Sequence, residues 1–235
     1  MRVEPYGVGS VVHVVKRGAR GMDIVQDDAD RWRFVRGLYL LNDAYQSQNW
    51  AREAKETDFF ERPPAWPEQE PLCSVLAWTL MPNHFHLLLH EDQEGGIAKF
   101  LQRFCGSMSA YSNKKYQETG SLFQGSYRSR TVDTEAYLQY VVSYIVVKNV
   151  LELYPGGLTR AIKDFDASWK WAATYPFSSF RSAALGKESP TINIKLLSEL
   201  GLVRKTFKRD SRDMLLAYAE KQEFLDVNQL LLEEW

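Results

Sequence analysis

Three of the four histidines in this 235-residue chain fall within one apolar segment, WTLMPNHFHLLLHE at residues 78–91. They are His84, His86 and His90. Side chains alternate across a β-strand, so these three would share one face, with successive ones about 7 Å apart. Neutral imidazoles at that spacing can converge on one divalent cation. The simpler alternative, favoured for an isolated His-x-His, is a set of half-buried polar residues on an exposed sheet face.

A second reactive group is offered by the segment YLQYVVSYIVVKN, in which Tyr137, Tyr140 and Tyr144 recur at spacings of three and four. On a helix these spacings put all three on one face. The commoner meaning is an aromatic core stripe, which we expect for at least one of them. A metal held by two histidines beside a phenol would instead suit nucleophilic attack at phosphorus, since the ion neutralises charge while the tyrosine becomes covalently attached.

Local patterns predict the elements that would position these groups. We expect strands at 10–17, 72–90 (a hairpin) and 120–132, and helices at 28–46, 95–117 and from Thr134 as N-cap to about 152. This order is the ferredoxin-like βαββαβ arrangement, an α+β fold with an antiparallel sheet and two helices on one face. Phe85, Leu87 and Leu89 would pack on those helices, and the third helix would cross the histidine face.

The chain is expected to divide at about residue 155. Residues 1–155 would form the α+β domain, interrupted at 47–71 by a proline-rich and charged surface insertion without periodicity. Residues 156–235 would be a mixed segment to about 185 and then a helical C-terminal extension. Its basic stretch RKTFKRDSRDMLLAYAEKQEF could reach DNA, although an amphipathic helix that closes the domain is the expectation.

Composition narrows the protein class. Hydrophobic residues make up 45% of the chain and charged residues 25%, as in globular proteins. Neither a run of about 20 apolar residues nor a signal peptide is evident, so a cytoplasmic protein without a membrane partner is expected. Two cysteines, Cys73 and Cys105, are too few for a disulfide framework and are expected to be buried thiols. A net charge of −1 means that phosphate binding needs local Lys and Arg clusters.

Longer motifs resemble a known family. The text MPNHFHLLLH followed by LFQG, together with VVHVVKRGARGMDIVQDDADRWRFV, YLQYVVSYIVVKNV and WKWAATYPFSSFRS, resembles the REP-associated tyrosine transposases. These are a branch of the insertion-sequence transposase-like HUH endonucleases. The similarity extends from the first expected strand to the Ser-Ser motif, covering residues 8–185.

The resemblance implies an HUH endonuclease fold with a nucleophile-bearing helix and a divalent Mg or Mn ion. It implies cleavage of single-stranded DNA beside an imperfect hairpin, with strand transfer through a 5′-phosphotyrosine and a free 3′-OH. His84 and His86 match the metal-binding pair, and Tyr144 matches the nucleophile. The branch is expected to act as monomers on hairpin-forming single-stranded DNA in the bacterial cytoplasm, at the nucleoid when bound.

The chain departs from the family where a metal-completing Asn or Gln should follow the tyrosine by four residues. Lys148 stands there, and Asn149 comes one position later. A protonated lysine offers only donors and cannot ligate a cation. Asn149 could take over through a shifted helix register, which a turn of roughly 100° per residue opposes. Alternatively, water or DNA phosphate could complete the metal shell, or Lys148 could stabilise the phenolate and the transition state.

Other residues near the expected site have weaker assignments. Tyr140, one turn before Tyr144, is a rival nucleophile but suits a packed aromatic better. His90 lies too far along the strand to be a ligand and is expected at the surface. His13, in the first strand, would border the same face, either in the core or behind the metal ligands.

A DNA-binding patch is expected near the last strand. Its cations would be Lys114, Lys115, Arg128 and Arg130, with Gln124 and Tyr127 offering hydrogen bonds or stacking to bases. Any one of these charges alone would suit a solvated surface equally well.

Two functions remain open. The first is an active metal-dependent endonuclease and strand transferase. The second is a catalytically inactive, domesticated hairpin-DNA-binding protein, favoured by Lys148 and opposed by the retention of His84, His86 and Tyr144. A histidine phosphoesterase acting on small phosphates would need a second histidine motif, and is set aside.

Overall fold

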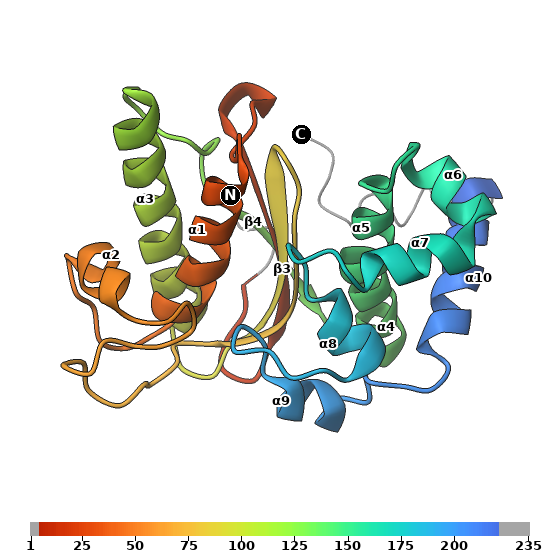
Figure 1. Cartoon of the computed structure of the whole chain (residues 1–235). Helices are drawn as coiled ribbons and strands as arrows, with labels where there is room; N and C mark the ends of the chain where they lie inside the picture. The colour runs from red at the N-terminus through yellow and green to blue at the C-terminus, as the bar shows by residue number, and fades with distance from the viewer. Residues whose placement is uncertain (1–4, 221–235) are drawn as a thin grey trace.

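The computed structural model describes residues 5–220 and has an α+β fold around one antiparallel sheet (Figure 1). The strands are β1 (Val11–Arg17), β2 (Ser74–Leu80), β3 (His84–His90) and β4 (Arg128–Val132), in the order β2-β3-β1-β4. This is the strand order of a ferredoxin-like βαββαβ unit, with β1 and β3 at the centre. The fold class expected from the sequence is confirmed.

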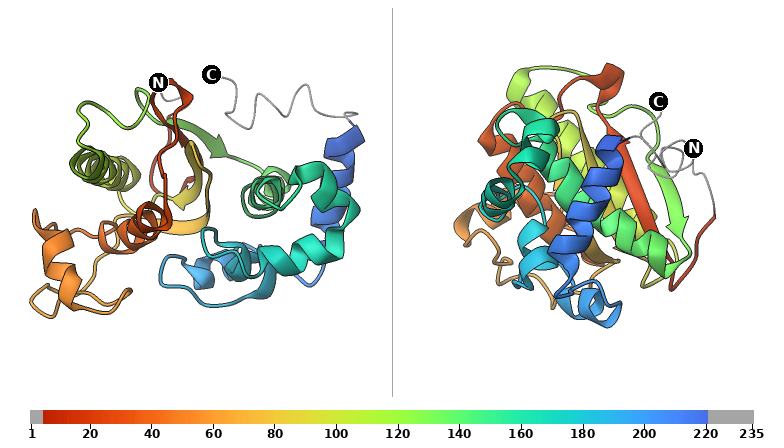
Figure 2. Two further views of the ribbon diagram at one scale, coloured as in Figure 1. Left: turned by 45° about the horizontal axis from the view of Figure 1, so that its top comes forward. Right: turned by 90° about the vertical axis from the view of Figure 1, so that its right-hand side faces the viewer.

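Helices cover both faces of the sheet (Figures 1 and 2). On one side lie α1 (Asp28–Leu40) and α3 (Gly96–Tyr116), with the short α2 (Trp50–Glu53) and the one-turn η2 (Ala54–Glu56) beyond them. On the other lie α4 (Glu135–Ser143), η3 (Tyr144–Lys148), α5 (Asn149–Glu152), α6 (Gly157–Lys163), α7 (Phe165–Ala172), α8 (Phe180–Leu185), α9 (Ile194–Glu199) and α10 (Phe207–Glu220). The further one-turn element η1 (Ala19–Gly21) follows β1.

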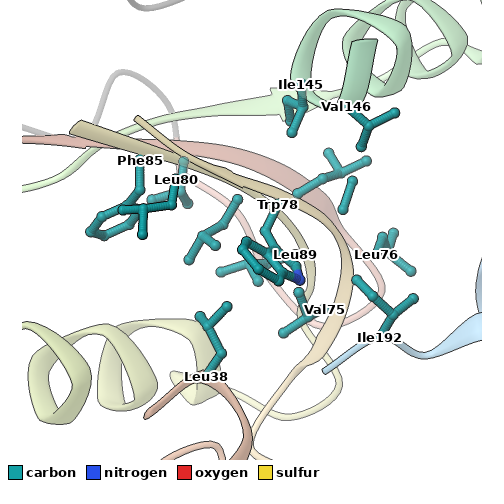
Figure 3. Close-up of a cluster of buried hydrophobic side chains, with 14 of the residues drawn as sticks. Leu38, Val75, Leu76, Trp78, Leu80, Phe85, Leu89, Ile145, Val146 and Ile192 are labelled. Carbon is teal, nitrogen blue, oxygen red and sulfur yellow. The ribbon is translucent and has the colours of Figure 1, made fainter. Parts of the chain in front are cut away.

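The apolar face of β3 packs on α1 and α3, as expected. Phe34 of α1 contacts Phe85 edge-on, with ring centroids 5.3 Å apart, and Phe104 of α3 at 4.9 Å. Figure 3 shows Ile145 and Val146 of η3 on the opposite side of the sheet from Leu38. Two separate apolar layers therefore hold the sheet between helices.

Local signals set where two helices begin. The Thr134 hydroxyl accepts a hydrogen bond from the Tyr137 N–H at 3.2 Å, so the expected N-cap of α4 is confirmed. The glycine pair before α3 is required by geometry: Gly95 has φ of 74°, and a Cβ on Gly96 would lie 2.0 Å from the Leu72 carbonyl oxygen.

The expected helix at 28–46 is too long, because α1 ends at Leu40. The Asn42 side chain donates to the Cys73 carbonyl at 2.7 Å and accepts from the Leu72 N–H at 3.1 Å. These contacts tie the chain to the start of β2 and turn it out of the helix. A residue 31 positions away therefore decides the boundary.

The insertion at 47–71 is not purely a surface segment. It forms α2 and η2, and Trp50, Ala54 and Trp66 are buried. The Trp50 indole N–H donates to Ser107 Oγ at 3.2 Å, which fastens the insertion to α3.

Two further boundaries differ from expectation. Only residues 128–132 of the segment 120–132 form a strand, although Phe123 makes an isolated bridge to Gly18. The segment expected to be mixed, 156–185, consists largely of α6, α7 and α8, each too short to give a clear periodicity.

Near the C-terminus, α10 packs against α4 and α6, and its Ser211 hydroxyl donates to Ser143 Oγ at 3.3 Å. This is the closing helix expected there; the rest of the predicted extension lies outside the described residues. The division at residue 155 remains a prediction. Cys73 is buried and Cys105 partly so. Within residues 5–220, no helix is long and apolar enough to cross a membrane.

Candidate active site

The sheet gathers three histidines on one face. In the antiparallel register His86 lies opposite Val15 of β1 and Thr79 of β2, while His13 lies opposite Leu88. Directly paired residues share a face, so His13, His84 and His86 point the same way. This is the face away from Phe85, and α4 and η3 cover it (Figure 1).

The three imidazoles contact one another. The ring centroids of His84 and His86 are 4.9 Å apart, and those of His13 and His86 are 5.3 Å apart in a stacked arrangement. His13 Nε2 and His86 Nδ1 form a hydrogen bond of 3.0 Å. The sequence left two positions open for His13, in the core or behind the histidine pair. The structure places it behind His86.

Hydrogen bonding defines the tautomer of His84. Its Nδ1 lies 2.7 Å from the Asn83 side-chain oxygen, which can only accept. Nδ1 therefore carries the proton, and Nε2 presents a lone pair. A partner behind a histidine that fixes its ring in this way is typical of metal ligands.

All three histidines are neutral at neutral pH. Burial lowers the pKa of His13 to about 3. Burial, followed by the charges of Arg17 and Lys148, lowers the pKa of His84 to about 4. Burial, followed by the neighbouring His84 and His13 and the Lys148 charge, holds the pKa of His86 well below its usual range. The neutral imidazole is the form that binds cations.

The helix across this face is distorted at Tyr144. Residues 144–148 form a π turn, in which the Asn149 N–H donates to the Tyr144 carbonyl. A π turn holds one more residue than an α turn and often marks a functional site. The Thr79 hydroxyl of β2 donates to the Ile145 carbonyl within this turn. The predicted covering helix is confirmed, with Tyr144 over His86 at a centroid distance of 5.7 Å.

Lys148 faces the tyrosine. Its ammonium donates to the Tyr144 hydroxyl oxygen at 3.3 Å and pairs with Glu152 Oε1 at 2.7 Å. The lysine is only 2% exposed, and its charge contributes to the lowered pKa values of His84 and His86. One cation therefore acts on both the phenol and the imidazoles.

Asn149, one residue later, is fully buried. Its side-chain oxygen and nitrogen have no hydrogen-bond partner within residues 5–220. Buried amides without partners are rare and call for an explanation, such as an absent ligand. The π turn supplies the one-residue shift that the sequence alone made improbable for this residue.

Access to the site is closed, because Tyr144 and His86 are both fully buried. A ligand can reach the phenol only after the chain that covers it moves. Motions of segments over active sites are common in enzymes and often limit turnover.

The structure also places Tyr140 and His90, two of the residues with weaker assignments. The Tyr140 ring stacks on Tyr144 at 6.3 Å. His90 is half-buried at the far end of β3, where its Nδ1 lies 2.5 Å from the Asp92 carboxylate. His90 is thus held by a surface neighbour, away from the histidine pair.

The expected DNA-binding patch is not brought together as one surface. Arg128 and Arg130 lie opposite Val15 and His13 on β4, so they share the histidine face. Lys114 and Lys115 are on α3, which covers the opposite side of the sheet (Figure 2). The sheet separates the two pairs.

Within the expected DNA-binding patch, Lys115 and Tyr127 have partners in the protein and Gln124 is exposed. Lys115 pairs with Asp27 at 2.7 Å and Asp30 at 2.5 Å. Gln124 is exposed, and the Tyr127 hydroxyl lies 2.8 Å from that of Tyr6. Lys115 is thus largely neutralised within the protein.

Two site residues were missed in the sequence. Asn83 supports His84, and Glu152 pairs with Lys148. The spacing of four between Lys148 and Glu152 is a helix-pair signal that could have found the second. Nothing in the sequence distinguishes Asn83 from an ordinary turn residue.

The site combines a ferredoxin-like sheet, a His-x-His strand and a tyrosine-bearing turn that lies over that strand. Residues 68–148 match the family described as "Transposase IS200 like". That segment spans about a third of the chain and holds β2, β3, α3, β4 and the Tyr144 turn. The resemblance to transposases is thereby confirmed over it.

One solved structure is similar to most of the chain. Its title is "Structure of the REP associates tyrosine transposase bound to a REP hairpin". The two chains are 12% identical, with a TM-score of 0.40, over 80% of this chain and 88% of the other. Among curated proteins no sequence matches.

Proposed function

We propose that the chain is a metal-dependent single-stranded DNA endonuclease and strand transferase, a transposase that cleaves beside hairpin DNA. The observation that carries this proposal is the setting of Tyr144, with the Lys148 ammonium 3.3 Å from its hydroxyl and His86 against its ring. A phenol beside a buried cation is favoured as phenolate, the nucleophilic form.

The chain's own groups account for the transfer. The Tyr144 oxygen attacks phosphorus as the bond from phosphorus to the 3′-oxygen breaks. The phenol gives up its proton to solvent before attack. The 5′-phosphate stays on the tyrosine, and the 3′-oxygen takes up a proton from solvent to leave as a free hydroxyl. Lys148 holds negative charge on the phenol oxygen before attack, and Glu152 keeps the lysine in place.

A divalent Mg or Mn ion fits the donors on this face. His84 offers Nε2, His86 is neutral beside it, and Asn149 has a buried amide oxygen without a partner in the described residues. Within residues 5–220 no three His, Cys, Asp or Glu side chains are grouped to hold a metal, and the buried Asn149 amide is therefore the third donor of this proposal. Bound there, the ion would polarise a phosphate oxygen and neutralise transition-state charge.

The second candidate is a catalytically inactive hairpin-DNA-binding protein. The observation that favours it is the burial of Tyr144 together with a cation, Lys148, where the family carries a neutral ligand. A charge at that place opposes a divalent ion, so binding could persist without cleavage.

The deciding experiment is incubation with end-labelled hairpin-bearing single-stranded DNA and Mn²⁺ on a denaturing gel. We expect a covalent protein–DNA band that disappears in chelator and in Tyr144→Phe. Tyr140→Phe is the matched control, since it removes the neighbouring stacked phenol and should keep the band. Tight binding of a broad hairpin library with no band would support the inactive binder instead.

A further inference from the structure

A large groove is lined by α3 and by the insertion that carries α2. Both elements lie on the opposite side of the sheet from α4 (Figure 1). The volume of the groove is about 1250 Å³, above the roughly 300–1,000 Å³ of small-molecule pockets. The insertion forms one wall through residues 46–52 and Lys55, and the exposed side of α3 forms the other. The groove suits an extended ligand.

The lining is strongly basic. Seven Lys and Arg side chains line the groove, and no Asp or Glu of the described residues is among them. Four of the seven, Arg52, Lys55, Lys99 and Lys114, are exposed and form no ion pair within residues 5–220. In a chain with a net charge of −1, this is a local concentration of unneutralised positive charge.

The spacing of the α3 cations suits a regular polyanion. Lys99 and Lys114 lie on one stripe of α3 that also contains Gln102, Gly106 and Ala110. At 1.5 Å per residue these lysines are about 22 Å apart along the helix axis. The small residues Gly106 and Ala110 between them keep bulky side chains off this wall, so a backbone carrying phosphates can approach along its length.

Side chains with fixed partners lie between these exposed cations. The Arg33 guanidinium lies 3.9 Å over the Trp50 ring and donates to Ser107 Oγ at 3.1 Å. Burial lowers the pKa of Arg33 to about 10, which still leaves it charged at neutral pH. Arg103 donates to the carbonyl of Asp43. The wall therefore carries charge in fixed positions.

We propose that this groove binds the phosphate backbone of a double-stranded nucleic acid, the paired stem of a hairpin. Single strands are usually held by exposed aromatic rings on which bases stack. Here Trp50 is buried beneath Arg33. The half-buried Tyr111 ring lies under Arg33 and Lys115, so the groove presents cations and amides to phosphates. That the double-stranded ligand is the stem of a hairpin rests on the proposed function. The binding of phosphates rests on the groove alone.

The test is fluorescence anisotropy of the full chain with a labelled hairpin of about 12 base pairs, at several salt concentrations. About 22 Å of groove spans only six or seven base pairs, so this stem exceeds it. The variant is Arg52→Gln with Lys99→Gln. The matched control is Lys163→Gln with Lys170→Gln, which removes the same charge from exposed residues of α6 and α7.

We expect the groove variant to weaken hairpin binding about tenfold at low salt. The slope of log affinity against log salt should fall by about 2, since each lost phosphate contact contributes about 0.9. The control pair should leave the slope unchanged. Equal losses in both variants, or an unchanged slope in the groove variant, would overturn the proposal, as would equally tight groove-dependent binding of an unpaired strand.

A covalent-adduct assay on hairpin-bearing single-stranded DNA, with protein in saturating excess and Mn²⁺, separates this proposal from the previous one. The groove variant should keep its Tyr144 adduct, because the groove lies across the sheet. If wild type forms no adduct but the slope changes as expected, the endonuclease proposal fails and the groove proposal stands. If the adduct forms and the groove variant binds hairpins like wild type, only the groove proposal fails.

Discussion

The two faces of strand β3 differ in almost every physical respect, although their residues alternate along seven positions. One face carries Phe85, locked edge-on against Phe34 and Phe104. The other carries His86, buried against His13 and Tyr144. Phe85 and His86 are both 0% exposed, so burial alone does not distinguish a residue that stabilises the fold from one that takes part in chemistry.

The difference lies in what burial does to each side chain. An aromatic ring gains free energy when it leaves water, whereas an imidazole loses it unless its polar atoms are paired. The lowered pKa values of His13 and His84 record that cost. Lys148 and Asn149 add two more buried polar groups to the same face. Buried polar groups that cost stability are expected at functional sites, where the packing of neighbouring residues offsets the cost.

The largest effect is expected from His86→Ala. Adduct formation should fall by about a thousandfold or more, because one proposed ligand beside the nucleophile is lost. The free energy of unfolding should fall by about 1–3 kcal/mol, since a cavity and an unpaired His13 nitrogen remain, partly offset by removal of a buried polar group. Single-turnover gels and urea unfolding measure the two. Full activity in this variant would remove the histidine face from the mechanism.

Phe85→Ala, one position away, should do the reverse. Deleting a buried phenylalanine ring costs about 3–5 kcal/mol of stability. At a temperature where the variant is still folded, it should form the adduct at nearly the wild-type rate. Urea denaturation with an activity assay on the folded fraction checks this. A large loss of activity in folded protein would mean that the two faces are not separable.

Much of this contrast was predictable from the sequence. The alternation in HFHLLLH sorts the two faces of β3, and the Thr134 cap together with the tyrosine spacing predicts the covering helix. These signals are local, because each is carried by neighbouring residues along the chain.

What could not be predicted depends on contacts between distant residues. The π turn at Tyr144 is held partly by Thr79 of β2, and α1 ends where Asn42 meets Cys73. The basic groove brings Arg52 of the insertion and Lys99 of α3, 47 positions apart in the chain, into one lining. No periodicity in the sequence encodes such pairs.

Acid should act selectively on the histidine face. Unfolded histidines bind protons near pH 6.5, whereas His13 and His84 in the fold do so only near pH 3 and 4. The unfolded state therefore gains protons first as pH falls below 6.5, and stability is lost at up to about 1.4 kcal/mol per pH unit for each histidine. Urea titrations of metal-free protein between pH 7 and 5 test this. In His13→Gln the slope should become shallower.

Lys148→Asn should help to distinguish an active endonuclease from a catalytically inactive DNA-binding protein. It restores an amide of the family type and removes the cation 3.3 Å from the Tyr144 oxygen. We expect Mn²⁺ to bind more tightly, measured by calorimetry, while adduct formation slows about tenfold to thirtyfold because the phenolate loses its partner. Lys148→Arg, which keeps a charge, is the control. A faster reaction in the asparagine variant would show that Lys148 weakens the site.

The smallest effect is expected at His13, behind the proposed metal ligands. If His86 Nδ1–H donates to His13 Nε2, His86 Nε2 is left with a lone pair for a cation; the reverse direction protonates Nε2 and blocks it. His13→Gln keeps an acceptor oxygen, whereas His13→Leu keeps the volume without one. We expect the leucine variant to bind Mn²⁺ about tenfold more weakly and the glutamine variant to stay near wild type. Calorimetry and ¹⁵N imidazole shifts of His86 read affinity and tautomer separately. Equal affinities in both variants would limit His13 to a packing role, and the polar face of β3 would then begin at His86.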